Sequence, residues 1–285
     1  MAGRNETRSQ VPPELLEQYV KQQETQYVQP NQNVSGYSVP TDFVELPSSG
    51  EFYTEDHPWH KKEKVEVRFM TTKEEDILTS PTYNREGVAF DKLIESILVD
   101  RVSVESLLIG DKNAILLNAR KNAYGSEYHF YSLCQKCLEG KELTANLEEL
   151  TNKDLSQLSC TKNSDGTFKV ELPKSKDVIQ FRLITGTDEK MIREQEKIRE
   201  KHNLPPEKVI SLHRQLIVSI NERTDRSYID QYIQKMLIKD SRFLQKVYEE
   251  TRPDVIFSYE HSCDSCGHQS KGVVPIGADF FWPDG

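Results

Sequence analysis

The sequence lacks the features of a membrane protein and of a secreted one. No apolar run approaches the ~18 residues that a membrane-spanning helix needs. The first residues, MAGRNETRSQVPP, lack the charged and then apolar pattern of a signal peptide. We therefore expect a soluble protein that is intracellular when it is made.

An excess of positive charge is also missing. The chain has 37 Lys and Arg against 46 Asp and Glu, which gives a net charge of −9. Proteins that bind nucleic acid usually carry a basic field, because neutralising phosphates supplies much of their affinity. Net acidity does not exclude a local basic patch, but it favours proteins as the binding partners.

Recognisable catalytic motifs are absent. The chain contains no G-x-x-x-x-G-K-[ST], no H-E-x-x-H and no G-x-S-x-G. Three consecutive acids, Glu74, Glu75 and Asp76, could serve general acid–base catalysis. Acidic residues are favoured in the first turn of a helix in any case, because they interact well with the helix dipole. His57 and His60 in DHPWH could be a pair of metal ligands, but a surface loop with its tryptophan packed on the core is the simpler interpretation. We predict that the protein is not an enzyme.

Cysteine is scarce, and four of the five cysteines form two C-x-x-C pairs. Cys134 and Cys137 lie in SLCQKCLEG, and Cys263 and Cys266 lie in HSCDSCGHQ. A strand-like run leads into each pair, and the second pair is followed by Gly and another strand. This is the pattern of a zinc knuckle, in which a tight turn directs two thiolates at one point. Two facing knuckles predict one four-cysteine zinc site, a structural one because four thiolates leave no position for water.

Two other interpretations of these cysteines stay open. The pairs could be independent turns with reduced, partly buried thiols. A redox C-x-x-C is disfavoured because that chemistry needs a thiolate at a helix N-terminus, and both pairs here follow strands. Disulfides are not expected in a reducing compartment. The fifth cysteine, Cys160 in QLSCTKN, is expected to be an ordinary thiol.

Composition divides the chain into three parts. Residues 1–42 are rich in Gln, Asn, Glu, Ser and Pro, and we expect an extended polar arm that binds a partner because it cannot bury enough apolar area to fold alone. Residues 43–126 are expected to form an α+β part that is mainly helical. Residues 127–285 are expected to form a knuckle-bearing sheet, with helices inserted at about 188–250.

Residue periodicity predicts the individual elements. KVEVRFM, TFKVEL and VIQFRLIT alternate as strands do, and a capping box of Thr71 with Glu74, or of Thr72 with Glu75, opens a helix. A longer helix is expected to have Asp111 as its N-cap and to stop at Gly125. Residues 188–250 follow a helical period and are expected to break at NLPP, NERTD and KD.

The predicted fold class is therefore α+β: helical segments plus a small antiparallel sheet that carries a split four-cysteine zinc knuckle. The inserted helices would explain the long separation of the two cysteine pairs. The strands in SEYHFYSLC and VIFSYEHSC are expected to be neighbours.

One block of the sequence resembles a known family. It comprises VELPSSGEFYTEDHPWHKKEKVEVRFMTTKEEDILTS, GVAFDKLIESILVD and LLIGDKNAILLNARKNAYGSEYHF, and it is similar to the baseplate hub protein family of T-even-type contractile-tailed bacteriophages. The resemblance covers about residues 43–140, and the second cysteine pair adds to it. The positions that carry it are Pro47, Gly50, Gly110, Asp111, Gly125, Cys134, Cys137, Cys263 and Cys266.

The resemblance implies a non-enzymatic role in building the central hub of the tail baseplate. The implied partners are other baseplate and tail proteins in a multi-subunit assembly. The implied location is the virion tail, with the host cytoplasm during assembly, and a role in assembly alone is equally compatible with it.

Two functions from other classes stay open. A zinc-ribbon nucleic-acid or transcription-associated factor should carry Lys and Arg around its knuckles. Here three lysines stand among four acids, which favours protein binding: Lys136, Lys141 and Lys271 against Glu139, Glu142, Glu260 and Asp264. A metal-dependent hydrolase would need a general base and an open metal position, and the sequence offers neither.

Overall fold

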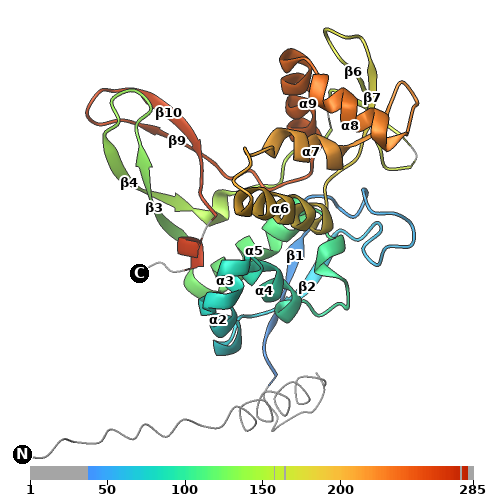
Figure 1. The fold of residues 1–285 in the computed structure, drawn as a ribbon. Helices are drawn as coiled ribbons and strands as arrows, with labels where there is room; N and C mark the ends of the chain where they lie inside the picture. The colour runs from blue at the N-terminus through green and yellow to red at the C-terminus, as the bar shows by residue number, and fades with distance from the viewer. Residues whose placement is uncertain (1–37, 157, 164, 277, 282–285) are drawn as a thin grey trace, which may run out of the picture. The chain divides into compact units, whose positions relative to one another are not determined.

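The structure is a computed structural model that describes residues 38–156, 158–163, 165–276 and 278–281. Most of the predicted polar arm, residues 1–42, lies outside the described residues, and the first described strand begins at Thr41. Helices and small antiparallel sheets make up the described part, which confirms the α+β class (Figure 1).

A strand pair and a set of helices follow the arm. Strand β1 (Thr41–Glu45) pairs antiparallel with β2 (Lys64–Arg68), whose alternating sequence buries Val65 and Val67. The helices that follow are α2 (Thr72–Thr79), α3 (Pro81–Glu86), α4 (Ala89–Ile97), the short 3-10 turn η1 (Val104–Ser106) and α5 (Ile109–Tyr124).

The acidic start of α2 has a structural explanation. Thr71 and Glu74 form the predicted capping box, the first of the two alternatives. The buried Glu74 carboxylate also accepts a hydrogen bond from Ser96 Oγ at 2.6 Å. Glu75 and Asp76 are exposed on the same helix. The hydrogen bonds of Glu74 hold α2 against α4, so this acidic run needs no catalytic role.

The prediction for the ends of α5 is half right. Gly125 ends the helix with a φ of +82°, as predicted. Asp111 is not the N-cap, because the helix begins two residues earlier, at Ile109, and Leu108 occupies the cap position. The Asp111 side chain instead accepts hydrogen bonds from Ser48, in the loop after β1.

The knuckle-bearing part consists of two hairpins. Strand β3 (Glu127–Leu133) pairs with β4 (Gly140–Asn146), and β9 (Ser258–Ser262) pairs with β10 (Gln269–Val273). Strands β3 and β9 are neighbours through side chains, since Ser132 Oγ lies 2.6 Å from Tyr259 Oη. They belong to different two-stranded sheets, so the predicted single knuckle sheet is in fact two sheets facing each other (Figure 1).

The segment between the hairpins contains a sheet as well as helices. Its four strands are β5 (Thr161–Lys162), β6 (Phe168–Glu171), β7 (Val178–Phe181) and β8 (Ile217–Ile220), in that order. Its helices are the short 3-10 turn η2 (Leu147–Glu149), which directly follows β4, and α6 (Gly186–Lys201), α7 (Lys208–Leu216), α8 (Arg226–Lys235) and α9 (Ile238–Thr251). A further 3-10 turn, η3 (Ala278–Phe281), follows the second hairpin.

Two predictions for this segment are wrong. Residues Ile217–Ile220 form strand β8, where a helix was expected, because their β-branched side chains pack beside β7 with Ile220 opposite Ile179. The last helix break falls at Met236 and Leu237 and not at KD, because Asp240 lies in the first turn of α9. The Asp240 carboxylate accepts the backbone N–H groups of Lys174 and Ser175 at 2.8 and 3.0 Å.

The core joins segments that are far apart in sequence. Trp59 is fully buried, which confirms the packed-loop interpretation of DHPWH. Arg120 on α5 is also fully buried, and its guanidinium donates to the carbonyls of Phe280, Gly125 and Glu127. This arginine therefore ties the end of the described chain to the junction between α5 and the first hairpin.

Candidate metal centre

Each cysteine pair occupies a hairpin turn built in the same way. In the first turn the Cys134 N–H donates to the Glu139 carbonyl at 2.8 Å, and the Leu138 N–H donates to the Cys134 carbonyl at 3.0 Å. The second turn repeats the latter bond, from Gly267 to Cys263 at 2.8 Å. The chain therefore uses one local geometry twice to present two thiols at the end of a hairpin.

The residue after each pair adopts a left-handed backbone conformation. Gly267 has a φ of +66°, which glycine adopts without steric penalty. Leu138, at the equivalent position, has a φ of +60°, which costs about 1–2 kcal/mol for a residue with a Cβ. The Leu138 side chain is 73% exposed, so it recovers little of this free energy by packing within the chain.

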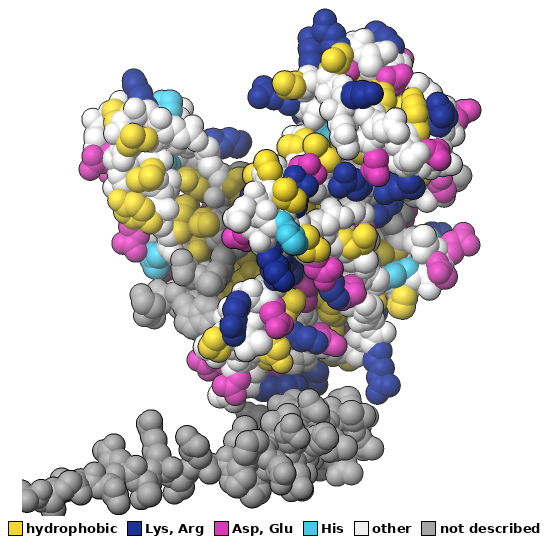
Figure 2. All heavy atoms as spheres, in the orientation of Figure 1, with side chains coloured by type: hydrophobic (Ala, Val, Ile, Leu, Met, Phe, Trp, Pro, Cys, Tyr) yellow, Lys and Arg dark blue, Asp and Glu magenta, His cyan; other side chains and the backbone are white. Residues whose placement is uncertain are grey.

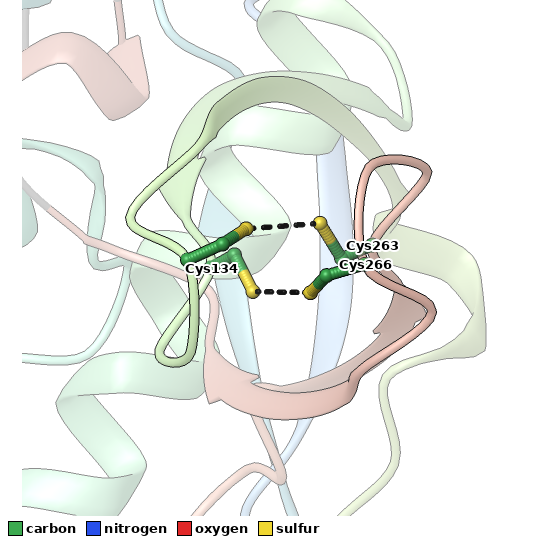
Figure 3. Close-up of side chains that lie close together, drawn as sticks. Cys134, Cys263 and Cys266 are labelled. Carbon is green, nitrogen blue, oxygen red and sulfur yellow. Dashed lines mark hydrogen bonds between the residues drawn. The ribbon is translucent and has the colours of Figure 1, made fainter.

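The two turns face each other and bring all four predicted cysteines together. The Sγ atoms of Cys134 and Cys266 lie 3.7 Å apart, and those of Cys137 and Cys263 lie 3.6 Å apart (Figure 3). All four sulfur atoms lie within 4.8 Å of one another. These separations are too long for a disulfide, whose S–S bond is ~2.05 Å. They approach the edges of roughly 3.8 Å in a tetrahedron with metal–sulfur bonds of about 2.3 Å. The four cysteines thus form a possible metal site.

The thiol groups and the backbone N–H groups around them shift the pKa values of the cysteines. Backbone N–H groups of Cys137 and Lys136 lower the pKa of the Cys134 thiol to about 6. At Cys137 the Glu139 backbone N–H lowers the pKa, but the Cys266 thiol, burial and the Cys134 and Cys263 thiols together raise it to about 12. Amide groups within the first turn therefore favour thiolate at Cys134. The close approach of the sulfur atoms disfavours a second negative charge unless a cation lies between them.

Contacts beside the sulfurs hold the two hairpins face to face. Lys141 Nζ lies 2.5 Å from Asp264 Oδ2, and this ion pair joins the start of β4 to the turn of the second hairpin. The Phe130 ring packs edge-on against Tyr259, with 4.9 Å between the ring centroids. The fold thus aligns the cluster through side chains as well as through the sulfur atoms.

The remaining sequence candidates take part in other contacts. His57 Nδ1 accepts the Trp59 N–H at 3.1 Å, and His57 Nε2 lies 2.9 Å from Ser106 Oγ. Both ring nitrogens are therefore occupied, and burial lowers the pKa of His57. His60 Nδ1 bonds to a backbone carbonyl. Cys160 lies apart from the cluster, 3.2 Å from Thr251 Oγ1, and burial raises the pKa of its thiol.

Sequence reasoning missed a buried polar joint in the N-terminal part. The Asp111 carboxylate accepts the Ser48 N–H at 3.0 Å, the Ser48 hydroxyl at 2.6 Å and the Tyr53 hydroxyl at 2.7 Å. Burial raises the pKa of Asp111, and the three donors offset part of that effect. The adjoining Gly110 lets the start of α5 approach Pro253, whose carbonyl oxygen would lie 2.0 Å from a Cβ at position 110. The polar run LPSSG and the motif LLIGD were the signals available in the sequence.

The fold and the cluster define an α+β protein whose first and last hairpins meet in a split four-cysteine centre. Comparison with family models identifies the chain more closely. Residues 41–282 match the family described as T4 bacteriophage base plate protein, and the chain belongs to this family. It is therefore a phage baseplate protein, consistent with the resemblance seen in the sequence. Searches of curated proteins and of solved structures found no significant match. Among the described residues, no helix has the length and apolar character that crossing a bilayer requires.

Proposed function

We propose that the chain is a structural subunit of the central hub of the tail baseplate, where it binds other tail proteins and assists or completes their assembly. The observation that carries this proposal is the family match over residues 41–282. The hub assignment rests on the sequence resemblance over about residues 43–140 together with the second cysteine pair. Two motifs of that block, LPSSG and LLIGD, contact each other through Ser48 and Asp111.

We infer that the four cysteines hold a structural Zn²⁺. Cys134, Cys137, Cys263 and Cys266 supply four soft thiolate ligands at separations close to those of a tetrahedral site. Zinc bound there would stabilise the fold by fixing the two hairpins against each other. Four thiolates fill the coordination shell, which leaves no position for a reacting water.

A non-enzymatic role is supported by the environment of His213, whose contact with a serine is the more deeply buried of two Ser–His contacts in the described residues; the other joins His57 to Ser106. His213 Nε2 lies 2.8 Å from Ser241 Oγ, beside a hollow of ≈ 340 Å³. Burial lowers the pKa of His213 to about 4, whereas an effective general base has a pKa near the working pH. The other ring nitrogen, Nδ1, has no hydrogen-bond partner that would orient the ring. This pair lacks the requirements of a catalytic dyad.

The nucleic-acid alternative is disfavoured by the charges around the knuckles. Lys141 pairs with Asp264, and Lys271 pairs with Glu260 at 3.0 Å. Two of the three lysines near the cysteines are thereby neutralised within the chain. Lys136 is left, which is too little positive charge for a phosphate-binding surface.

The arm formed by residues 1–42 is proposed to bind a neighbouring subunit. This part of the proposal rests on composition, since the segment is polar and contains only one short amphipathic patch. Ordering such a segment requires extended contacts with a partner, because each fixed residue loses roughly 1–2 kcal/mol of conformational free energy.

The proposal is tested by recovering a tagged copy of the chain from infected cells after nuclease treatment. We expect other baseplate proteins to co-purify at physiological salt, and their identity to be given by mass spectrometry. Recovery of the chain as a free monomer, or its loss of all partners on nuclease treatment, would contradict the proposal.

A further inference from the structure

An exposed apolar surface lies on the outward side of the first hairpin. Tyr131 and Leu133 are two residues apart on β3, so they share one side of the strand, and they are 69% and 56% exposed. Leu138, in the adjoining turn, is 73% exposed. We refer to Tyr131, Leu133 and Leu138 as the hairpin face. Figure 2 shows apolar side chains gathered on the lobe that the two hairpins form.

Tyr131 and Leu133 form a continuous part of the hairpin face because Gly140 leaves room between them. Gly140 lies opposite Leu133 in the strand register. A Cβ at position 140 would lie 1.6 Å from the Tyr131 hydroxyl, so the tyrosine side chain extends across the glycine. Tyr131 and Leu133 therefore flank a position without a side chain and together present a flat apolar surface.

Leu138 indicates that this surface serves contacts outside the chain. The equivalent turn in the second hairpin has Gly267 at the same left-handed position, where leucine is strained. Packing within the chain offsets little of this backbone strain, since most of the Leu138 side chain is exposed. A strained, exposed leucine is explained if its side chain is buried by a partner.

The charges around the hairpin face specify the chemistry of that partner. Glu142 lies directly opposite Tyr131 on β4, and Glu139 follows Leu138. Neither acid is in an ion pair within the described part of the chain. Lys141 is bound to Asp264 of the other hairpin, and Lys136 is the one exposed cation in the turn. The rim of the hairpin face is therefore acidic on balance.

We propose that the hairpin face is a docking surface for another baseplate protein, which contributes apolar side chains flanked by Lys or Arg. This inference rests on the proposed function, since it places the partner in the same assembly. The cysteine centre sets the angle between the two hairpins and so holds the surface in position.

The test measures incorporation of variants into baseplates. Plasmid-encoded chains complement a phage that lacks the gene, and quantitative mass spectrometry counts the copies per isolated baseplate. We expect Leu133→Asp to lower incorporation about tenfold, because a buried leucine contact is lost and a charge is placed in the interface. Glu142→Lys should also lower it. Ile238→Asp changes a residue on α9 that is 74% exposed, and it should incorporate normally.

Leu138→Gly separates binding from folding. It should raise the unfolding temperature of the free protein, because the backbone strain is relieved, and yet lower incorporation several-fold. Gly267→Leu is the matched control on the second hairpin. It should lower the unfolding temperature and leave the incorporation of folded protein unchanged.

The outcomes distinguish this inference from the proposed function. If wild-type chain fails to associate with baseplates, the proposed function fails. If wild-type chain associates and the hairpin variants associate equally well, or Ile238→Asp is impaired as much as they are, only the docking surface is refuted. A photo-cross-linking residue in place of Leu133 should capture a Lys- or Arg-containing segment of a baseplate protein, whereas capture of an acidic segment or of nucleic acid would overturn the proposal.

Discussion

The Sγ atoms of Cys137 and Cys263 lie 3.6 Å apart, although 126 positions separate the two residues in the chain. The four-stranded sheet and helices α6 to α9 all lie between them in sequence. A metal ion bound by these thiols would close a long loop, and closing a long loop removes much conformational entropy from the unfolded chain. The centre would thus stabilise the whole inserted segment as well as the two turns.

The first prediction concerns the metal. The purified protein should contain one zinc per chain, measured by elemental mass spectrometry. Cys263→Ser should lose the zinc and lower the unfolding temperature, because removing one thiolate weakens binding free energy that is of order 10 kcal/mol in small zinc peptides. The large apolar core should soften the loss of stability here.

Cys160→Ser is the matched control, since Cys160 contacts Thr251 and lies outside the cluster. It should keep the zinc and nearly all of the stability. A metal-free wild-type protein that unfolds at the same temperature as the metal-loaded one would refute the structural role.

The second prediction concerns the buried joint at Asp111. Asp111→Ala should lower the free energy of unfolding by about 3–5 kcal/mol, because three buried donors on Ser48 and Tyr53 lose their acceptor. Asp111→Asn should lower it less, since one amide oxygen still accepts a bond. Urea denaturation measures both. Asp76→Ala, at an exposed acid on α2, should change stability by less than about 0.5 kcal/mol. Equal stability of Asp111→Ala and Asp76→Ala would contradict this account.

The third prediction compares Gly110, in the first turn of α5, with Gly125 at the C-cap of that helix. Helix propensity alone favours Ala at position 110, but the Cβ would clash with the Pro253 carbonyl at 2.0 Å. Gly110→Ala should therefore destabilise by about 3 kcal/mol or more. Gly125→Ala has open space, and only the backbone conformation with φ +82° and ψ 177° opposes the side chain, so the loss of stability should be about 1–3 kcal/mol and smaller than that of Gly110→Ala. Denaturation midpoints of the two variants decide the order, and a more stable Gly110→Ala would show that α5 does not approach Pro253 closely.

The fourth prediction concerns pH. Burial lowers the pKa of His213 from 6.5 to about 4, so the folded state disfavours the charged ring. The neutral ring contributes stability that is fully present above pH 6.5 and is lost as the pH falls through 4. At pH 5 the loss from this residue should be about 2 kcal/mol relative to pH 7. His213→Gln keeps a polar group beside Ser241 and does not titrate. Its stability should fall less than that of the wild type between pH 7 and pH 5, and an equal fall would contradict the assignment.

The fifth prediction concerns the arm. Deleting residues 2–40 leaves β1 intact, since that strand begins at Thr41. The truncated chain should fold and should bind as much zinc as the full chain, yet incorporate into baseplates poorly. Circular dichroism, elemental analysis and the incorporation assay test these points in turn. Normal incorporation of the truncated chain would show that the arm is not needed for binding a subunit.

Local sequence patterns predicted the elements and residues whose causes are local. The C-x-x-C turns, the Thr71 capping box and the Gly125 helix stop each depend on a few adjacent residues, and all three are present. Strand β8 was missed because its four residues, IVSI, continue the apolar period of α7, and only pairing with β7 makes them extended. The hydrophobic periodicity of a segment cannot reveal a partner strand that lies 39 residues earlier in the chain.

The role of Asp111 could not be read from its own neighbourhood either. An aspartate near the start of a helix usually caps that helix, and here the better donors are on Ser48, which lies 63 positions away. The four cysteines could be grouped because paired thiols imply a shared ligand. That the pairs would lie on two separate hairpins depended on the packing of Tyr259 between them, which the spacing did not contain.

The central claim is that this chain is a component of the baseplate hub. Mass spectrometry of purified baseplates, of hub assembly intermediates and of infectious particles tests it most directly. We predict that the chain is present at a fixed ratio to other hub proteins in the baseplates or in their intermediates. Its absence from all three preparations, while it is abundant elsewhere in the infected cell, would contradict the claim.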